Sequence, residues 1–268
     1  MTRHATSLRY RLARQFALRD LPLQLEGVAQ SLVVTLPADP NAPLDEMAAQ
    51  QAARGASAMV EPARAKDVDT EGRAEALARS TVAAGAHLPY WALLWPSGLA
   101  LAEALLADPE VARGARALEL GCGLGATAAV ALSLDARLTV CDLFAEALRF
   151  AEYNTLRCAG RSPSSLLLNW RTSAGRARLL ASAPYDLLLA ADVLYEAEDV
   201  EPLLTLAPAL LRPGARFWLA EPGRRASRDF VARARALGWR DSPSIVERAW
   251  PPDGDVTRVV VHRFSVAQ

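Results

Sequence analysis

From residue 87 onward, the spacing of apolar and polar residues predicts strands and helices in regular alternation. Strands are expected at 115–120, 138–141, 166–170, 185–191 and 215–220, and helices at 126–132, 145–157, 200–211 and 227–237. The run Leu187-Leu188-Leu189-Ala190 is continuously apolar, which is typical of a strand covered on both faces. This pattern predicts a doubly wound α/β sheet.

The two ends of the chain depart from this alternation. Residues 244–248 and 256–264 predict two strands joined by a turn that contains Pro252-Asp253-Gly254, and therefore an antiparallel hairpin. Residues 21–25 and 31–36 predict a shorter hairpin around Glu26-Gly27.

The composition along the chain divides it into three parts. Residues 38–86 are rich in Ala, Gln, Arg, Glu and Pro, and Leu44-Asp45-Glu46-Met47 opens an expected helix. We therefore expect an N-terminal β-hairpin extension (1–37), a helical or mobile linker region (38–86) and an α/β domain (87–268).

A glycine-rich turn follows the first strand of this domain. Gly121, Gly123 and Gly125 stand at alternate positions between a strand and a helix. This order is that of a nucleotide-binding α/β domain, in which glycines let the backbone approach a ligand closely. Asp142 ends the second strand about 20 residues after Gly121, where a carboxylate can accept the hydroxyls of a ribose. The three glycines and Asp142 are therefore expected to bind an adenosyl cofactor.

The residue at position 119 separates two candidate cofactors. Gly121, Gly123 and Ala126 fit the glycine pattern of dinucleotide-binding proteins loosely, so the glycines alone do not exclude NAD. The carboxylate of Glu119 would repel a pyrophosphate, but it suits the ammonium and sulfonium groups of S-adenosylmethionine. We therefore expect S-adenosylmethionine, with Glu119 at its methionine end.

Composition narrows the class of protein further. The chain has 268 residues, 51% of them hydrophobic, with 30 basic and 30 acidic side chains. This neutral balance gives no reason to expect a nucleic-acid partner, and no apolar run has the length of a membrane span. The three cysteines and three histidines show no paired spacing, so we expect neither a disulfide framework nor a metal site. Free cysteines are typical of a reducing compartment, so we expect a cytoplasmic protein.

The basic start of the chain has two interpretations. Residues 1–19 contain arginines and no acid, a pattern shared with mitochondrial transit peptides. Lys66 is the only lysine in the sequence, however, so arginine is the ordinary base throughout. This usage favours a bacterial protein from a GC-rich genome.

Three further segments carry a resemblance to a known family. They are the aromatic stretch Pro89-Tyr90-Trp91-Ala92-Leu93-Leu94-Trp95-Pro96, Asp192-Val193-Leu194-Tyr195 after the fourth strand, and Glu221-Pro222-Gly223-Arg224 after the fifth. With the glycine turn they resemble the class I, seven-strand methyltransferases that use S-adenosylmethionine. Within that class they are most similar to the family-16 protein-lysine methyltransferases, marked by D-x-x-Y after strand four, and especially to those that methylate the electron-transfer flavoprotein β-subunit and their bacterial relatives. Glu221 stands where that family usually has aspartate, and residues 38–86 have no counterpart in it.

The resemblance implies a fold and two catalytic residues. The fold is a doubly wound, seven-stranded Rossmann-like sheet that ends in an antiparallel hairpin, here preceded by a β-hairpin and helical extension. Asp192 lies at the carboxyl end of a central strand, where open α/β sheets bind ligands, and is expected to contact both the cofactor and the acceptor amine. Tyr195 is expected to supply an aromatic wall and a hydroxyl near the methyl path.

The remaining candidates each have a structural alternative. Trp95 is expected to pack over the cofactor and Trp91 to line the amine channel, unless both are hydrophobic anchors. Asn169 and Trp170 are expected at the adenine ring, unless Trp170 is a core residue. Arg224 is expected to bind an acidic substrate, unless it caps backbone carbonyls.

These residues predict an S-adenosylmethionine-dependent N-methyltransferase that acts on a protein lysine. A lysine of the electron-transfer flavoprotein β-subunit is the expected target, and neither nucleic acid nor membrane is expected as a partner. We expect a monomer. Two alternatives stay open: an N-methyltransferase for a small amine of the nicotinamide type, and a cofactor-binding partner protein without catalysis.

Overall fold

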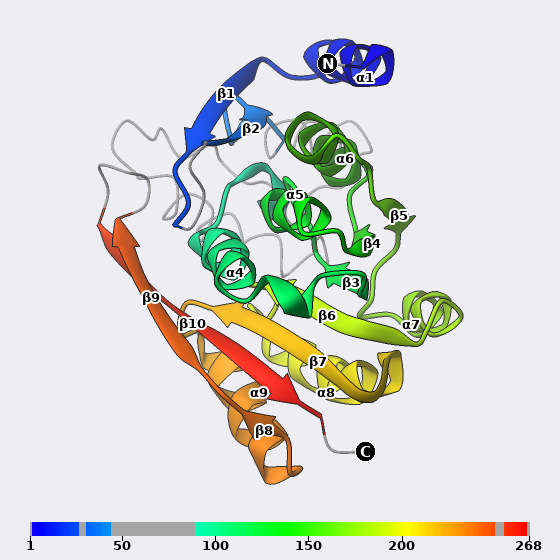
Figure 1. Ribbon diagram of the computed structural model, residues 1–268, viewed down its shortest axis with the longest axis vertical. Coiled ribbons are helices and arrows are strands. Elements are labelled where there is room, and N and C mark those ends of the chain that lie inside the picture. Colours follow the sequence, from blue (N-terminus) through cyan, green and yellow to red (C-terminus); the bar gives the residue numbers. More distant parts are fainter. Residues whose placement is uncertain (1, 27–30, 44–88, 250–254, 267–268) are drawn as a thin grey trace, which may run out of the picture.

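A central sheet organises the part of the chain that the computed structural model describes, namely residues 2–26, 31–43, 89–249 and 255–266 (Figure 1). Its strand order is β5-β4-β3-β6-β7-β10-β8, and β9 pairs with β10. The strands are β3 (Arg116–Leu120), β4 (Arg137–Asp142), β5 (Ser164–Leu167), β6 (Tyr185–Ala191), β7 (Leu211–Glu221), β8 (Arg240–Asp241), β9 (Ser244–Ala249) and β10 (Val256–Ser265).

The pairing directions define the topology. Strands β3 to β7 are parallel, whereas β10 runs antiparallel to β7. Strands β8 and β9 both pair with the side of β10 that faces away from β7. Strand β8 pairs with residues 264–265 and β9 with residues 256–261, so together they fill one edge position. The sheet therefore has seven strand positions, and the predicted doubly wound fold with its antiparallel end is confirmed.

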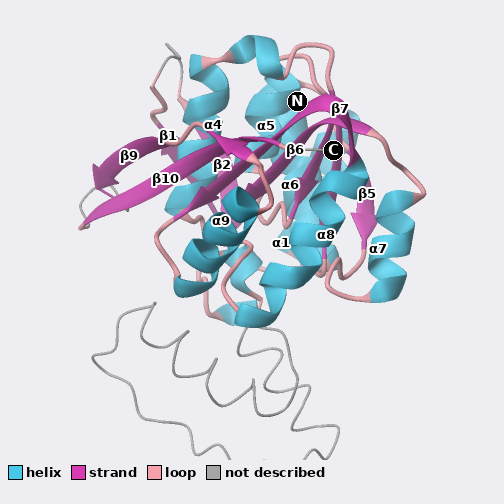
Figure 2. Cartoon of the chain, turned by 90° about the horizontal axis from the view of Figure 1, so that it is seen from below, coloured by secondary structure: helices cyan, strands magenta, loops and turns pink. Residues whose placement is uncertain are grey.

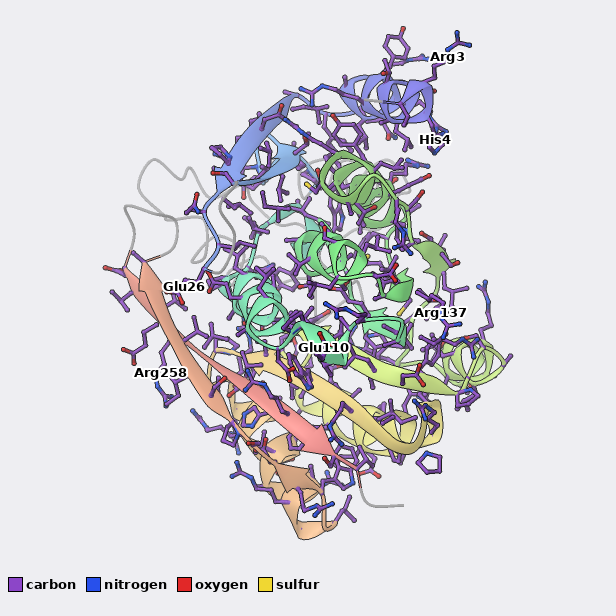
Figure 3. All side chains as sticks on the ribbon, in the orientation of Figure 1. Arg3, His4, Glu26, Glu110, Arg137 and Arg258 are labelled. Carbon is purple, nitrogen blue, oxygen red and sulfur yellow. The ribbon has the colours of Figure 1, made fainter. Side chains whose placement is uncertain are left out.

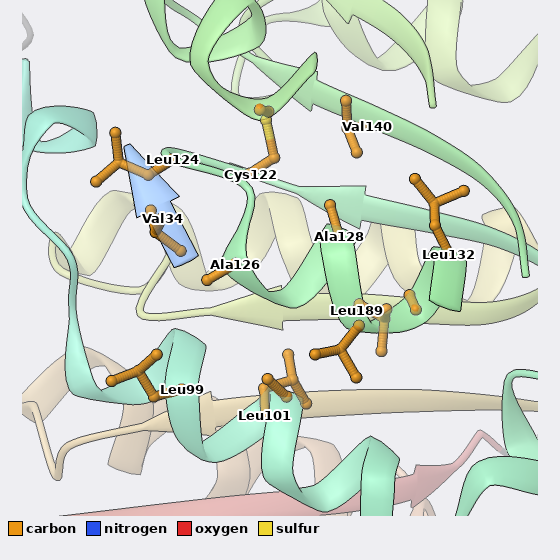
Figure 4. Packing of buried hydrophobic residues seen from close by; sticks show 14 of the residues in the cluster. Val34, Leu99, Leu101, Cys122, Leu124, Ala126, Ala128, Leu132, Val140 and Leu189 are labelled. Carbon is orange, nitrogen blue, oxygen red and sulfur yellow. The ribbon is translucent and has the colours of Figure 1, made fainter. Parts of the chain in front are cut away.

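Helices cover both faces of this sheet. Figure 1 shows α4 (Pro96–Ala107), α5 (Ala126–Ser133) and α6 (Ala145–Ala159) on one side, and α7 (Ser173–Leu180), α8 (Val200–Leu210) and α9 (Arg225–Ala236) on the other. Along β6, Leu187 and Leu189 join the first hydrophobic cluster, and Leu188 and Ala190 join the second. This division explains the continuously apolar sequence, since successive side chains enter opposite cores. Figure 4 shows Leu189 packed among side chains such as Leu101 and Ala128.

An extension from the amino terminus packs against α6. It consists of α1 (Arg3–Ala13) and the antiparallel pair β1 (Leu18–Leu23) and β2 (Leu32–Pro37), in which Leu23 faces Leu32. The hairpin was expected from the sequence, but the helix α1 was not. Its first turn is capped by the Thr2 hydroxyl, which accepts from the Ala5 amide, and its buried residues share the core of α4–α6.

Three short segments and one shifted strand complete the description. One-turn helices span η1 (Tyr90–Ala92), η2 (Pro109–Val111) and η3 (Ala197–Asp199). The strand expected at 166–170 is observed as β5 at Ser164–Leu167, and Leu168 and Trp170 instead become buried residues of the following loop. The helix expected from Leu44 and most of the region 38–86 lie outside the described residues.

Charged side chains and the carboxyl-terminal hairpin mark the outer surface. Figure 2 shows β9 and β10 extending past the body of the domain. Figure 3 shows Arg258 on the carboxyl-terminal hairpin and Arg3 and His4 on α1.

Candidate active site

The glycine turn between β3 and α5 adopts backbone angles that favour glycine. Gly121, Gly123 and Gly125 have φ of +67°, +50° and +78°. A Cβ on Gly125 would lie 2.6 Å from Ala151 Cα in α6, so this position serves helix packing. Gly121 and Gly123, in contrast, line a cavity. The two functions of the motif, ligand approach and helix packing, therefore fall on different glycines.

Asp142 fixes the conformation of this turn. Its Oδ2 accepts from the Gly123 amide at 3.1 Å, and its Oδ1 accepts from the Phe144 amide at 3.0 Å. Burial raises the pKa of this carboxyl, although the backbone donors oppose the shift. A carboxylate has about four acceptor sites, so lone pairs remain for the hydroxyls of a ribose.

A cavity of about 670 Å³, including its open mouth, lies at the carboxyl ends of the parallel strands. This is where open α/β sheets bind ligands. Its lining residues come from the aromatic stretch, the glycine turn and the segments after β4, β5 and β6: Tyr90, Trp91, Trp95, Gly121, Gly123, Asp142, Leu143, Phe144, Leu168, Asn169, Trp170, Arg171, Ala191, Asp192, Val193 and Tyr195. The structure thus brings together nine of the residues singled out from the sequence, namely Trp91, Trp95, Gly121, Gly123, Asp142, Asn169, Trp170, Asp192 and Tyr195.

The segment after β5 forms one end of the cavity. Asn169 Oδ1 accepts from the Arg171 amide at 2.9 Å, which closes a tight turn. Trp170 is buried and belongs to the second hydrophobic cluster while also lining the cavity. The two alternatives considered for Trp170, core residue and ligand-contacting residue, are therefore compatible.

Asp192 is held in an unusual conformation beside this cavity. It has φ of +53°, which is rare for a residue other than glycine, and its amide donates to the Ala220 carbonyl at 2.9 Å. The Arg224 guanidinium binds its carboxylate at two points, with Nε 2.6 Å from Oδ1 and Nη2 2.8 Å from Oδ2. Arg224 was expected to bind an acidic substrate; in the structure this side chain binds Asp192 and lies 5.7 Å from the Trp95 ring centre.

Three aromatic rings meet at the other end of the cavity. Tyr90 contacts Trp95 edge to face at 6.1 Å and Tyr195 at 5.4 Å between ring centres. Trp95 Nε1 donates to the Tyr90 carbonyl at 2.9 Å, which fixes the indole. Trp91 points its ring into the core, where it packs on Phe16 at 5.8 Å and Phe150 at 5.4 Å, so it anchors this stretch.

Glu119 lies behind the cavity wall. Its side chain is buried on β3, it contacts Thr127 of α5, and Oε2 has no hydrogen-bond partner among the described residues. Burial raises the pKa of Glu119 to about 8. The charge of Asp142 raises this pKa as well, whereas the hydrogen bond from Thr127 lowers it. Glu119, Gly125 and Arg224 are thus the sequence-predicted residues that do not line the cavity.

Seven cavity residues have no role predicted from the sequence, and two of them, Tyr90 and Arg171, carry polar groups on their side chains. The aromatic run between two prolines was a sequence feature from which a site role for Tyr90 could be predicted. No local sequence pattern predicted Arg171, because it contacts residues that are distant in the sequence.

Within the described ranges, no group of His, Cys, Asp and Glu side chains is placed to hold a metal ion, and no helix is long and apolar enough to cross a membrane.

Comparisons with known proteins agree with this geometry. Residues 118–217 match the profile of a methyltransferase domain. The fold is similar to that of an S-adenosylmethionine-dependent methyltransferase from Agrobacterium tumefaciens, with a TM-score of 0.50 and 18% identity over 66% of this chain and 64% of that one. The fold is therefore similar to that of S-adenosylmethionine-dependent methyltransferases, and residues 118–217 match a methyltransferase domain, as the sequence predicted.

Curated relatives carry a more specific name. The chain is 32% identical over 141 residues to the electron transfer flavoprotein beta subunit lysine methyltransferase of Xenopus laevis, covering 51% of this chain and 53% of the relative. It is 31% identical over 139 residues to the protein of the same name from Rattus norvegicus, covering 51% of each. The chain thus spans about half the length of the curated relatives it matches, and the family resemblance expected from its motifs is confirmed.

Proposed function

We propose that the protein is an S-adenosylmethionine-dependent methyltransferase that methylates a lysine of a protein acceptor, with a protein like the electron-transfer flavoprotein β-subunit as the target. The observation that carries this proposal is the charge of the cavity. Asp142 and Asp192 both line it together with Arg171. Arg171 is paired with Asp199 and Asp192 is paired with Arg224, so the charge of Asp142 is left over and these five side chains sum to one negative charge. A negative site suits a cationic ligand and disfavours a pyrophosphate.

The residues present fit the cofactor. Gly121 and Gly123 let the ligand reach the backbone, and Asp142 offers acceptors to a ribose. Asn169 and Trp170 provide a polar group and a ring for the adenine. Glu119, with a buried oxygen that lacks a partner, is placed to act from behind the turn on the methionine end. When bound, S-adenosylmethionine supplies a methyl group on a sulfonium that leaves as a neutral thioether.

The acceptor amine would lie between Asp192 and the aromatic rings. A lysine ammonium has a reference pKa of about 10.4, so it must lose a proton before its nitrogen can attack. The Arg224 fork uses two acceptor positions of the Asp192 carboxylate, and the others are left for an amine N–H. Trp95, Tyr90 and Tyr195 exclude water and present ring edges and faces to the aliphatic stem. Orientation of the amine for in-line attack is the main contribution of these residues.

Calorimetry tests the cofactor. We expect S-adenosylmethionine to bind and NAD to bind at least tenfold more weakly, and Asp142→Asn to weaken the binding of S-adenosylmethionine about tenfold. Tighter binding of NAD would contradict the proposal.

Transfer of a labelled methyl group tests the reaction. Asp192→Asn should lower transfer to the flavoprotein β-subunit at least a hundredfold. Asp135→Asn is the matched control, since Asp135 also has a positive φ (+68°) and binds an arginine, Arg161, but lies at the opposite edge of the sheet. Label on small amines without any labelled protein would favour the small-molecule alternative, and cofactor binding without transfer would favour a non-catalytic partner protein.

A further inference from the structure

Arg171 joins the two ends of the cavity. Its guanidinium carbon lies 4.9 Å from the ring centre of Trp170, at the end assigned to the adenine, and 4.7 Å from the ring centre of Tyr195, at the end assigned to the amine. Arg171 is itself part of the cavity wall. One planar side chain therefore contacts an aromatic ring on each side of the path between cofactor and acceptor.

Asp199 fixes the position of this guanidinium. The two side chains form a two-point ion pair through Arg171 Nε and Nη2, and Asp199 is fully buried. Asp199 Oδ2 also accepts from the Glu196 amide at 3.1 Å, in the residue that follows Tyr195. The anchor of Arg171 thus also orders the backbone that carries Tyr195.

The Arg171 guanidinium, 4.7 Å from the Tyr195 ring centre, is close enough for its charge to act on the phenol. Burial raises the pKa of Tyr195, although the charge of Arg171 opposes the shift, so the hydroxyl stays protonated at neutral pH. Tyr90 contacts the same ring edge to face at 5.4 Å. The Tyr195 ring is therefore restrained by both Arg171 and Tyr90.

We propose that Arg171 is a positioning residue for methyl transfer: anchored on Asp199, it holds the ring of Tyr195, and with the ring its hydroxyl, against the acceptor amine while packing on Trp170 beside the cofactor. This inference rests on the proposed function, and it adds a residue outside the D-x-x-Y segment to the acceptor site. Loss of Arg171 would leave Tyr195 in place but free to change rotamer, so turnover would fall more than binding.

The control for this proposal is a second arginine–tyrosine pair. Arg116 lies 5.0 Å from the ring centre of Tyr185 at the start of β3 and β6, the edge of the sheet opposite the cavity. Arg116→Met and Arg171→Met therefore remove the same kind of stacking contact, one from the tyrosine that begins β6 and the other from the tyrosine that follows its carboxyl end.

Two measurements on the full chain test the proposal. In protein labelled with 3-fluorotyrosine, the ¹⁹F resonance of Tyr195, identified by its loss in Tyr195→Phe, should shift and broaden in Arg171→Met and stay unchanged in Arg116→Met. In steady-state assays with the protein acceptor, Arg171→Met should lower kcat at least tenfold, with KM for the acceptor and Kd for S-adenosylmethionine changed less than about threefold.

A double-mutant cycle separates positioning from general damage. If Arg171 acts through Tyr195, kcat of Arg171→Met/Tyr195→Phe should equal that of Arg171→Met within about twofold. Should Arg171→Met fail to fold, Arg171→Lys takes its place, since an ammonium keeps the charge beside Asp199 but cannot reach Tyr195 at the same time.

The role of Arg171 would be overturned if the double variant lost kcat by the product of the two single-variant losses. It would also be overturned if the Tyr195 resonance were unchanged in Arg171→Met. The resonance is measured without any methyl transfer. Failure of the wild-type protein to bind S-adenosylmethionine or to label an acceptor would instead overturn the proposed function.

Discussion

Arg224 binds both carboxylate oxygens of Asp192, at 2.6 Å and 2.8 Å, and so links the loop after β7 to the loop after β6. The Asp192 side chain is 6% exposed and that of Arg224 is 35% exposed. Removing the guanidinium would leave a nearly buried carboxylate without its cation, which is the costly way to break an ion pair.

Arg224→Met should therefore lower both stability and methyl transfer. We expect about 1–2 kcal/mol less free energy of unfolding, a moderate value because Arg224 is partly solvated, and at least a tenfold loss of kcat. Arg228→Met is the control, since exposed Arg228 donates only to the nearby Gly223 carbonyl. Equal urea midpoints and rates for the two variants would show that the ion pair has no such role.

Glu119 should make stability depend on pH. Its folded-state pKa of about 8 lies above the ordinary glutamate pKa of 4.5. Between these two pH values the native state therefore keeps a proton that the unfolded state has lost. The free energy of unfolding should fall as pH rises from about 4.5 to 8, by up to about 5 kcal/mol at 1.4 kcal/mol per pKa unit. Glu119→Gln should remove this dependence. In urea titrations, the free energy of unfolding of the variant minus that of the wild type should therefore increase as pH rises across that range. A constant difference would contradict the assignment.

Asn154 connects the amino-terminal extension to the glycine turn. Fully buried, it accepts from the Thr35 amide at 2.8 Å and donates to the carbonyls of Thr35 at 2.9 Å and Leu124 at 2.8 Å. Asn154→Ala would leave these three backbone groups unpaired, and we expect a loss of about 3–5 kcal/mol. Asn154→Asp should not rescue, because a carboxylate oxygen would face two carbonyls. Calorimetric melting measures both variants, and recovery by Asp would argue against this network.

His262 forms a buried charged cluster beneath the loop that carries Arg224. Its Nδ1 lies 2.8 Å from Asp241 Oδ2 and its Nε2 lies 3.6 Å from Glu221 Oε1. Burial alone would lower the pKa of His262, but the two carboxylates raise it above 6.5. Its contribution to stability is complete below pH 6.5 and is lost as pH rises through the raised pKa. His262→Gln should thus destabilise the protein more at pH 6 than at pH 9, as urea titrations at both values would show.

The sheet and half of the site were predictable because they depend on local pattern. The apolar run of β6, the glycines and Asp142 follow from the chemistry of neighbouring residues, and they lie where expected. The α1 helix had a signal too, since Ala5, Leu8 and Leu12 are spaced for one helix face and are buried, although the arginines between them are also typical of a transit peptide.

The remaining parts of the site depend on contacts between distant residues. Arg224 could be placed beside the site from its motif, but its partner Asp192 is 32 positions away. Glu119 stands next to the turn in the sequence, yet successive side chains of a strand point to opposite faces, and its carboxylate enters the layer beneath α5. Arg171 acquires its role only when Trp170, Tyr195 and Asp199 are brought together.

Trp91, described above as packing on Phe16 and Phe150, ties the first forty residues into the same core as the sheet. We therefore expect the two regions to melt as one cooperative unit, in a single thermal transition in which the amino-terminal hairpin and the candidate active site are lost at the same temperature. A shortened protein that lacked α1, Phe16 and the hairpin should expose the Trp91 indole beside the pocket and lose activity although no other residue of the pocket has been changed.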